Sequence, residues 1–352
     1  MNKQGKTPVL AFFVISLWGG LFFQYHPILA RHNENKLLIS NPTSIPLTVQ
    51  QVNDRENSFS CKEIDQQQDI HVEQCISEKY LILNQPISAA YNQLPDATYR
   101  YGSTQRGKRQ IHHGIDIKNN LDTPVLAAED GVVIVAGKDD ERAYGPTTDF
   151  YGQLVIIRHD LEILPQPIYT LYGHLYHLSV KVGQKVKRGQ VIGTVGMGGV
   201  AIGYHLHFEV RYGKNDYEST RNPELWLMPI TLQNNEKSGV LSVRIVNSQG
   251  KPIQVSQIVL KKKEAAAGEL PIYLNAYDDS SQNSNGVTGK FANKTPSQTN
   301  RIGREERLQE DFAIGGLQAG SYILSFTTSK VFNLEINIYP AKLTYLSISM
   351  NS

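Results

Sequence analysis

The chain has 352 residues, of which 40% are hydrophobic and 19% are charged. This composition is typical of a folded protein with two or three domains and excludes disorder throughout. The formal net charge of +2 provides no strongly basic field, so we expect no nucleic-acid partner.

Residues 1–30 have the pattern of an export segment. Two lysines precede an apolar run over residues 9–23, and no charged residue follows until Arg31. The run is shorter than the roughly 20 residues that a membrane-spanning helix needs, which favours a signal peptide. An uncleaved anchor that includes residues 24–29 stays open, because Ile28 stands where a cleavage site prefers a small residue. We expect a periplasmic, envelope-bound or secreted protein that contacts a membrane only if this segment is retained.

Residues 31–94 are predicted to form a small β-rich N-terminal unit. They are polar, with short branched runs at residues 44–49 and 80–83. The only two cysteines of the chain, Cys61 and Cys75, fall in this unit. In an oxidising compartment we expect them to form a disulfide, which the chain-entropy account values at about 3 kcal/mol. Zinc thiolates are the less favoured alternative, because no other cysteine joins the pair.

Residues 95–230 contain many short strand-like segments with frequent glycines and almost no helical periodicity, a pattern that predicts an antiparallel all-β core. These segments are residues 124–128, 131–136, 153–158, 169–172, 190–195 and 205–211. Two longer polar connections, residues 138–150 and 160–166, are predicted to be surface loops that border a cleft.

Residues 239–352 are predicted to form a β-sandwich accessory domain after the polar stretch 233–238. Alternating apolar residues mark strands at residues 240–246, 312–314, 322–327, 334–338 and 343–350. Residues 278–307 are rich in Ser, Asn, Gln, Lys and Thr and are expected to form a long mobile loop. The phrase 312–324 resembles the closing strands of transthyretin-like or carboxypeptidase-regulatory-like domains. We expect this domain to space or orient the rest of the protein and to carry no chemistry.

Seven of the ten histidines lie between residues 112 and 207. His205 and His207 are two positions apart in a strand-like run, so both point to one face with their Cβ atoms roughly 7 Å apart. His112 and Asp116 share one face of an extended segment in the same way. Two histidines and one carboxylate form a catalytic zinc site with one open position, and spacing alone leaves open which strand histidine binds. Non-haem iron takes the same ligands, but expected export and the absence of oxidative-cofactor motifs favour zinc.

Five segments occur in an order that resembles the lysostaphin-type or LytM-like zinc endopeptidases, which cut peptide cross-links in bacterial cell walls. The resemblance covers residues 99–211 and rests on residues 112–117 (His-His-Gly-Ile-Asp-Ile), 154–159, 171–175 (Leu-Tyr-Gly-His-Leu), 180–196 and 205–210. It implies one zinc ion on His112, Asp116 and His207. It also implies that His174 and His205 are two catalytic histidines that do not bind the metal.

The implied chemistry is amide hydrolysis. Zinc lowers the pKa of its bound water to near 7 and polarises the scissile carbonyl. We expect His205 to act as the base and His174 to stabilise the transition state, since an imidazole with a pKa of about 6.5 suits proton transfer. Glu209 shares the face of His205 and His207, and either a hydrogen bond behind the metal ligand or a simple salt bridge fits that place.

Two stretches depart from the pattern of the family. Its members usually carry Ser-Thr-Gly before the His-x-His strand, whereas this chain has Ala201, Ile202 and Gly203. The change removes hydroxyl groups from the expected substrate groove and leaves the metal ligands intact. Residues 138–150 are also longer than the usual hairpin and are expected to deepen or partly cover the cleft.

Three functions fit these residues. The preferred one is an exported zinc endopeptidase that hydrolyses peptide bonds of peptidoglycan stems or cross-links. The second is a non-catalytic envelope protein of the same fold that binds wall peptides or activates a partner hydrolase. The third, an exported protease that acts on proteins, is not separated from the first by any motif.

Overall fold

The computed structural model describes residues 58–67, 69–266, 268–277 and 302–351. The expected export segment, the predicted strand at 44–49 and most of the expected loop at 278–307 lie outside these residues. The described part consists of β-strands with two short 3₁₀ helices, η1 (Tyr217–Ser219) and η2 (Pro223–Leu225), which confirms the all-β prediction. None of its helices has the length and hydrophobicity needed to cross a membrane.

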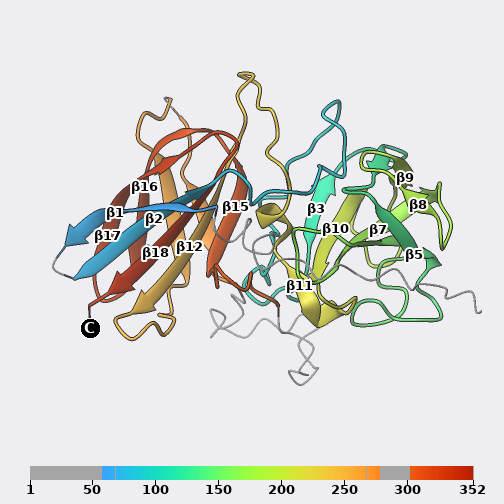
Figure 1. The fold of residues 1–352 in the computed structure, drawn as a ribbon, viewed down its shortest axis with the longest axis horizontal. Helices are drawn as coiled ribbons and strands as arrows, with labels where there is room; N and C mark the ends of the chain where they lie inside the picture. The colour runs from blue at the N-terminus through green and yellow to red at the C-terminus, as the bar shows by residue number, and fades with distance from the viewer. Residues whose placement is uncertain (1–57, 68, 267, 278–301, 352) are drawn as a thin grey trace, which may run out of the picture. The chain divides into compact units, whose positions relative to one another are not determined.

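A nine-stranded sheet forms between residues 115 and 221, and all of its strand pairs are antiparallel (Figure 1). Strand β10 (His205–Tyr212) pairs with three neighbours, β3, β7 and β11. The other strands are β3 (Ile115–Lys118), β4 (Pro124–Leu126), β5 (Gly131–Lys138), β6 (Gln153–His159), β7 (Ile168–Leu178), β8 (Lys185–Val186), β9 (Val191–Val195) and β11 (Thr220–Arg221).

The alternation of side chains along β10 separates a core face from a polar face. Leu206, Phe208 and Val210 point into the main hydrophobic core of this sheet, where Phe208 packs against Tyr172. The intervening positions carry histidines, a glutamate and an arginine, and all of these are buried as well. Because strand side chains alternate with a period of two, one strand supplies both the core and a polar site.

The C-terminal region is a β-sandwich. Its five-stranded sheet has the order β1-β2-β18-β12-β15 and its four-stranded sheet the order β14-β13-β16-β17. Side chains of both sheets share one core, for example Val243 and Leu346 from the first and Leu260 and Ile336 from the second. The strands are β12 (Gly239–Asn247), β13 (Gln257–Lys262), β14 (Ile272–Asn275), β15 (Phe312–Leu317), β16 (Gly320–Thr327), β17 (Val331–Ile338) and β18 (Leu343–Met350). The pair β12–β18 is parallel.

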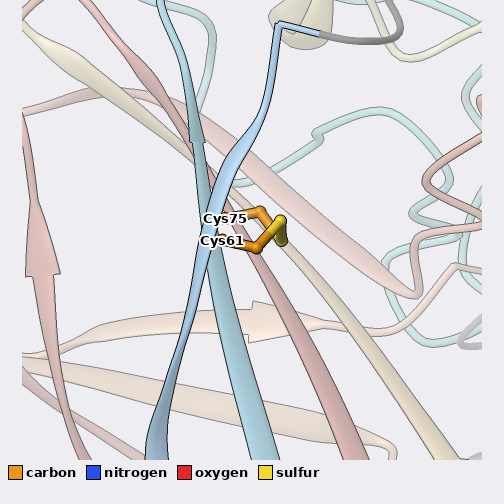
Figure 2. The surroundings of a disulfide bond; sticks show 2 residues. All are labelled: Cys61 and Cys75. Carbon is orange, nitrogen blue, oxygen red and sulfur yellow. A yellow bond between two sulfur atoms is a disulfide. The ribbon is translucent and has the colours of Figure 1, made fainter.

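The hairpin β1 (Ser60–Gln67) and β2 (Ile70–Ser77) belongs to this C-terminal sheet, because β2 pairs with β18 over its whole length. Cys61 and Cys75 face each other across the hairpin and form the expected disulfide (Figure 2). Residues 60–77, which fall within the expected N-terminal unit, thus form a hairpin that is hydrogen-bonded to the last strand of the C-terminal sheet. The expected strand at residues 80–83 makes only an isolated bridge between Leu83 and Leu227.

Candidate metal centre

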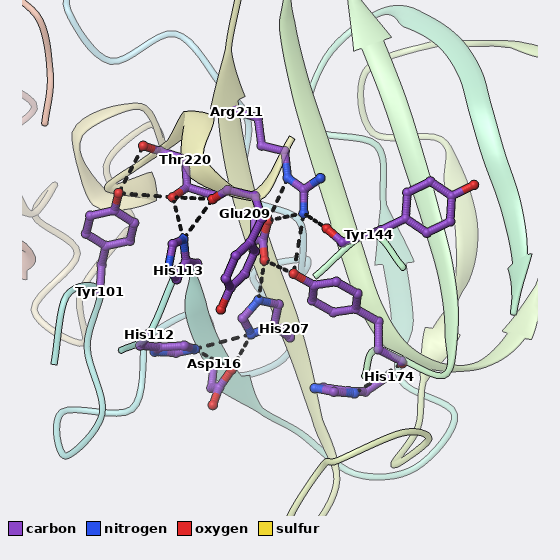
Figure 3. A network of polar contacts seen from close by, with 12 residues as sticks. Tyr101, His112, His113, Asp116, Tyr144, His174, His207, Glu209, Arg211 and Thr220 are labelled. Carbon is purple, nitrogen blue, oxygen red and sulfur yellow. Dashed lines mark hydrogen bonds and ion pairs between the residues drawn. The ribbon is translucent and has the colours of Figure 1, made fainter. Parts of the chain in front are cut away.

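Strand register brings two of the expected ligands together. Asp116 on β3 lies directly opposite His207 on β10 in the antiparallel pair. His112 precedes β3, and its backbone is held by hydrogen bonds with Ser103 and Gly102. Figure 3 shows the three side chains gathered at one point beside β10.

The three donor atoms form a nearly equilateral triangle. Asp116 Oδ1 lies 3.2 Å from His112 Nε2 and 2.9 Å from His207 Nδ1, and the two nitrogens are 3.2 Å apart. Zinc–ligand bonds of 2.0–2.1 Å in a tetrahedron place the donors roughly 3.3 Å from one another. The triangle therefore fits three of the four positions around a zinc ion.

The hydrogen bonds behind the ligands decide which ring nitrogens carry lone pairs. His112 Nδ1 lies 2.7 Å from the carbonyl oxygen of Tyr99, and His207 Nε2 lies 3.0 Å from the carboxylate of Glu209. Both partners can only accept, so these two nitrogens donate, and in the neutral rings the opposite nitrogens carry the lone pairs. Two lone pairs and a carboxylate oxygen then face one another at hydrogen-bond distance. These groups repel one another unless a cation lies between them.

The charges at these ligands lead to the same conclusion. Burial disfavours the ionised form of Asp116, yet His112 and His207 hold the pKa of its carboxyl well below its usual range. Burial also disfavours the imidazolium of His207, but Asp116 and Glu209 raise its pKa to about 9. The two carboxylates therefore favour positive charge at His207, which is the charge that a bound metal ion would supply.

Glu209 is itself fixed by a buried network. Its carboxylate contacts the guanidinium of Arg211 at 2.7–2.8 Å and accepts a hydrogen bond from the hydroxyl of Tyr151. Arg211 also donates to the carbonyl of Tyr144 at 2.8 Å (Figure 3). Burial opposes ionisation of Glu209, but Arg211 and His207 lower its pKa to about 2. The group behind His207 is therefore a carboxylate.

The two expected catalytic histidines lie beside the triangle. His174 and His205 have ring centroids 4.8 Å apart, and His205 Nε2 is 3.5 Å from Asp116 Oδ1. Each ring donates from Nδ1 to a carbonyl, His174 to Gly198 at 2.8 Å and His205 to Gly203 at 2.9 Å. Their Nε2 atoms consequently carry lone pairs. Burial lowers the pKa of both rings, that of His174 to about 3.

Backbone geometry at His174 is unusual and has a local cause. Its φ is +60°, a left-handed conformation that is rare for residues other than glycine, asparagine and aspartate. The amide and ring of His174 both contact the carbonyl of Tyr151, at 2.9 and 3.2 Å. Tyr151 therefore links the donor triangle to His174. Its hydroxyl donates a hydrogen bond to Glu209, and its carbonyl accepts one from the amide of His174.

The remaining histidines of the region lie apart from the triangle. His113 is buried against Tyr217 and Thr220, and His159 against Asp130 and Thr170. His177 is exposed. Tyr172 is a core residue whose hydroxyl accepts a hydrogen bond from the amide of Ala128. Sequence reasoning missed Arg211 and Tyr151, although the alternation that places Glu209 on the face of His207 extends to Arg211.

A hollow of about 420 Å³ is lined by residues that adjoin His174 and His205, the two expected catalytic histidines. Gly198, which accepts the hydrogen bond from His174, is part of its wall, and so is Tyr204, the neighbour of His205. Lys138 and Asp149 line it from the two ends of the loop that was expected to border a cleft. The hollow thus adjoins residues that contact or neighbour His174 and His205.

Residues 110–219 match Peptidase family M23. ShyC of Vibrio cholerae, a peptidoglycan DD-endopeptidase, is 39% identical over 103 residues, which are 29% of this chain and 21% of that protein. The DD-carboxypeptidase/endopeptidase Mpg of Neisseria meningitidis is 38% identical over 102 residues, 29% of this chain and 20% of that protein. The chain therefore spans only about a fifth of the length of these relatives.

Among solved structures, the catalytic domain of lysostaphin from Staphylococcus simulans is 28% identical and covers 32% of this chain and 76% of its own, with a TM-score of 0.28. A score of this size carries no weight, so the assignment rests on the family match and on the site. The matched segment contains the whole triangle of His112, Asp116 and His207 together with both neighbouring histidines. The matched segment is therefore similar to the peptidase domains of family M23.

Proposed function

We propose that the chain is an exported zinc endopeptidase that hydrolyses peptide bonds in peptidoglycan stems or cross-links. The observation that carries this proposal is the convergence of three lone-pair donors with two further histidines whose Nε2 atoms are unprotonated. The curated relatives, among them DD-endopeptidases of peptidoglycan, support the substrate class. Their likeness covers the peptidase domain alone.

Each of the five residues has a role in this proposal. His112, Asp116 and His207 would hold zinc, which would supply an acidified water with a pKa near 7 and polarise the scissile carbonyl. His205 takes the proton from the attacking water through Nε2 and passes it to the departing amine. His174 also presents a proton acceptor, so it stabilises negative charge on the substrate oxygen only after it has gained a proton.

The other parts of the chain have supporting roles. We propose export through residues 1–30, which agrees with a cross-strand disulfide in the described part of the chain. The C-terminal β-sandwich is proposed to be a transthyretin-like or carboxypeptidase-regulatory-like accessory domain that spaces or orients the peptidase. The boundaries 31–94, 95–230 and 239–352 remain our proposal for the domains.

The proposal is tested with isolated cell-wall sacculi. The full chain should release new amino termini from sacculi, and a chelator should stop this release until zinc is restored. Stoichiometric zinc without any release would favour the non-catalytic wall-binding alternative. Cleavage of unfolded proteins at a rate equal to that of sacculi would favour the general protease.

Two substitutions test whether His207 is a metal ligand and His205 a catalytic base. His207→Ala should remove zinc and activity together, because it deletes one corner of the donor triangle. His205→Ala should retain one zinc per chain, measured by atomic absorption, while activity falls by about 10²- to 10⁴-fold, the usual contribution of a positioned proton-transfer group. Loss of zinc from the His205→Ala protein would overturn the assignment.

A further inference from the structure

The hollow beside the catalytic histidines has apolar walls and a backbone floor. Tyr176, Met197 and Tyr204 line it with side chains that are 45–48% exposed. Gly152 and Gly199 meet beneath them, and both have a left-handed φ of +67°. A Cβ on Gly199 would lie 2.3 Å from the carbonyl oxygen of Phe150, so the floor requires glycine. The glycines keep this part of the hollow free of side chains.

Lys138 and Asp149 are the only lysine, arginine, aspartate or glutamate residues among the residues that line the hollow. Lys138 and Asp149 are both exposed, and neither makes a side-chain ion pair or hydrogen bond among the residues that the structure describes. They also do not pair with each other within 4.0 Å. A free cation and a free anion beside aromatic walls are both available to a ligand, and apolar walls focus the fields of such charges.

Asp139 holds the base of the loop in place, and this fixes the backbone positions of Lys138 and Asp149. Asp139 is fully buried, and its Oδ2 accepts hydrogen bonds from the amides of Phe150 and Tyr151 at 3.0 and 2.8 Å. The amide of Asp149 donates to the carbonyl of Asp139 at 3.0 Å. The backbone of Asp149 and that of Lys138, the residue before Asp139, are therefore positioned before any ligand arrives.

We propose that Lys138 and Asp149 select peptides in which a residue next to the cleaved bond carries both a free carboxylate and a free ammonium group. Lys138 binds the carboxylate, and Asp149 binds the ammonium. This inference rests on the proposed endopeptidase function and names the substrate chemistry that the site accepts. A cross-link made of glycine or of neutral residues leaves both charges without a partner and is bound more weakly.

The test uses four versions of one cross-linked peptide that differ at a single residue. Its carboxylate is either free or a carboxamide, and its amine is either free or acetylated. The full-length zinc protein is compared with Lys138→Gln, Asp149→Asn and two matched controls, Lys185→Gln and Asp140→Asn, which change exposed charges outside the hollow. Cleavage assays give kcat and KM for each combination of protein variant and peptide. Calorimetry with zinc-loaded His205→Ala protein gives the dissociation constant of each peptide without turnover.

We expect Lys138→Gln to raise KM about tenfold for the free carboxylate and to leave KM for the carboxamide unchanged. Asp149→Asn should do the same for the free amine and not for the acetylated peptide. kcat should change little, because neither residue contacts the reacting atoms. Both effects should shrink in 1 M salt, where the Debye length is about 3 Å.

The outcomes separate this inference from the proposed function. Equal losses of kcat/KM for all four peptides, or no loss beyond that of the control variants, would show that the two charges do not select substrate. If the wild-type chain cleaves none of the peptides while the binding preference is found, the endopeptidase proposal fails and the selectivity stands.

Discussion

Glu209 and Glu310 are both buried carboxyl groups, but they lie in opposite surroundings. Glu209 contacts Arg211 and His207, which overcome the effect of burial and lower its pKa to about 2. Glu310, beside β15, accepts hydrogen bonds from the hydroxyl of Tyr277 at 3.2 Å and the amide of Glu305 at 3.0 Å. It has no ion pair among the described residues, and burial raises its pKa to about 8.

This difference shows where the molecule maintains a buried charge. A buried ion is costly unless a counter-ion and hydrogen bonds compensate it. The nine-stranded sheet provides Arg211 as this counter-ion, so Glu209 stays ionised and accepts a hydrogen bond from His207 Nε2. The sandwich provides only neutral donors for Glu310, and its carboxyl is mostly protonated at neutral pH. The charged carboxylate lies where a metal ligand needs it.

The largest expected effect comes from removing the counter-ion of Glu209. Arg211→Met leaves a fully buried carboxylate without its guanidinium, a change that typically costs about 3–5 kcal/mol. Arg158→Met, which breaks the exposed Arg158–Asp160 pair, should cost about 0–1 kcal/mol. The free energies of unfolding from urea titrations of the two variants measure the contrast. Equal costs would mean that Glu209 gains nothing from its buried partner.

The second effect concerns Glu310 and depends on pH. Its pKa of about 8 in the folded chain exceeds the ordinary value of 4.5. The folded state therefore keeps a proton that the unfolded chain releases between these pH values. This contribution to stability is complete below about pH 4.5 and is lost as pH rises through 8. Glu310→Gln should remove the loss, so its stability relative to wild type should increase by about 2–3 kcal/mol from pH 5 to pH 7.

Urea titrations at several pH values check this expectation. Glu335→Gln is the matched control, because Glu335 is half-exposed and pairs with Lys263 at the surface. Its difference from wild type should stay nearly constant with pH. A Glu310→Gln difference that is also constant would show that Glu310 is ionised in the folded protein and that the comparison with Glu209 is wrong.

The site was largely predictable because its ligands follow short-range rules. His205 and His207 share a face by strand alternation, and His112 and Asp116 are close in sequence. The order of segments across residues 99–211 then indicated which strand histidine lies with His112 and Asp116. Tyr151 could not be found in this way. It contacts Glu209 and His174 across sequence separations of 58 and 23 residues, and nothing local marks it.

The fold was predictable where apolar alternation is strong, as in β17 and β18, whose buried and exposed positions alternate. β1 was missed because its sequence, Ser-Cys-Lys-Glu-Ile-Asp-Gln-Gln, is polar. It is held by pairing with β2, and β2 in turn pairs with β18 near the other end of the chain. Strands that are so far apart in the sequence cannot be recognised as partners from the alternation of residues within either strand.

The smallest expected effect tests whether the charge of Glu209 acts on the metal ligand. Glu209→Gln keeps an oxygen that can accept from His207 Nε2, but it removes the negative charge that makes the ring a stronger donor. Substitution of such a partner typically weakens metal binding by about 10- to 100-fold. Competition with a chromophoric chelator measures the zinc dissociation constant, and Glu218→Gln, an exposed neighbour in sequence, serves as the control.

Two roles of Glu209 are distinguished by combining this variant with Arg211→Met. If Glu209 only neutralises Arg211, then removing both charges in Glu209→Gln/Arg211→Met restores zinc affinity and stability together. If the carboxylate strengthens His207 as a donor, the double variant regains much of its stability, because no unpaired buried charge remains, while zinc affinity stays about 10- to 100-fold weaker. We expect the second result, because the 3.0 Å contact of Glu209 is with the ring that holds the metal.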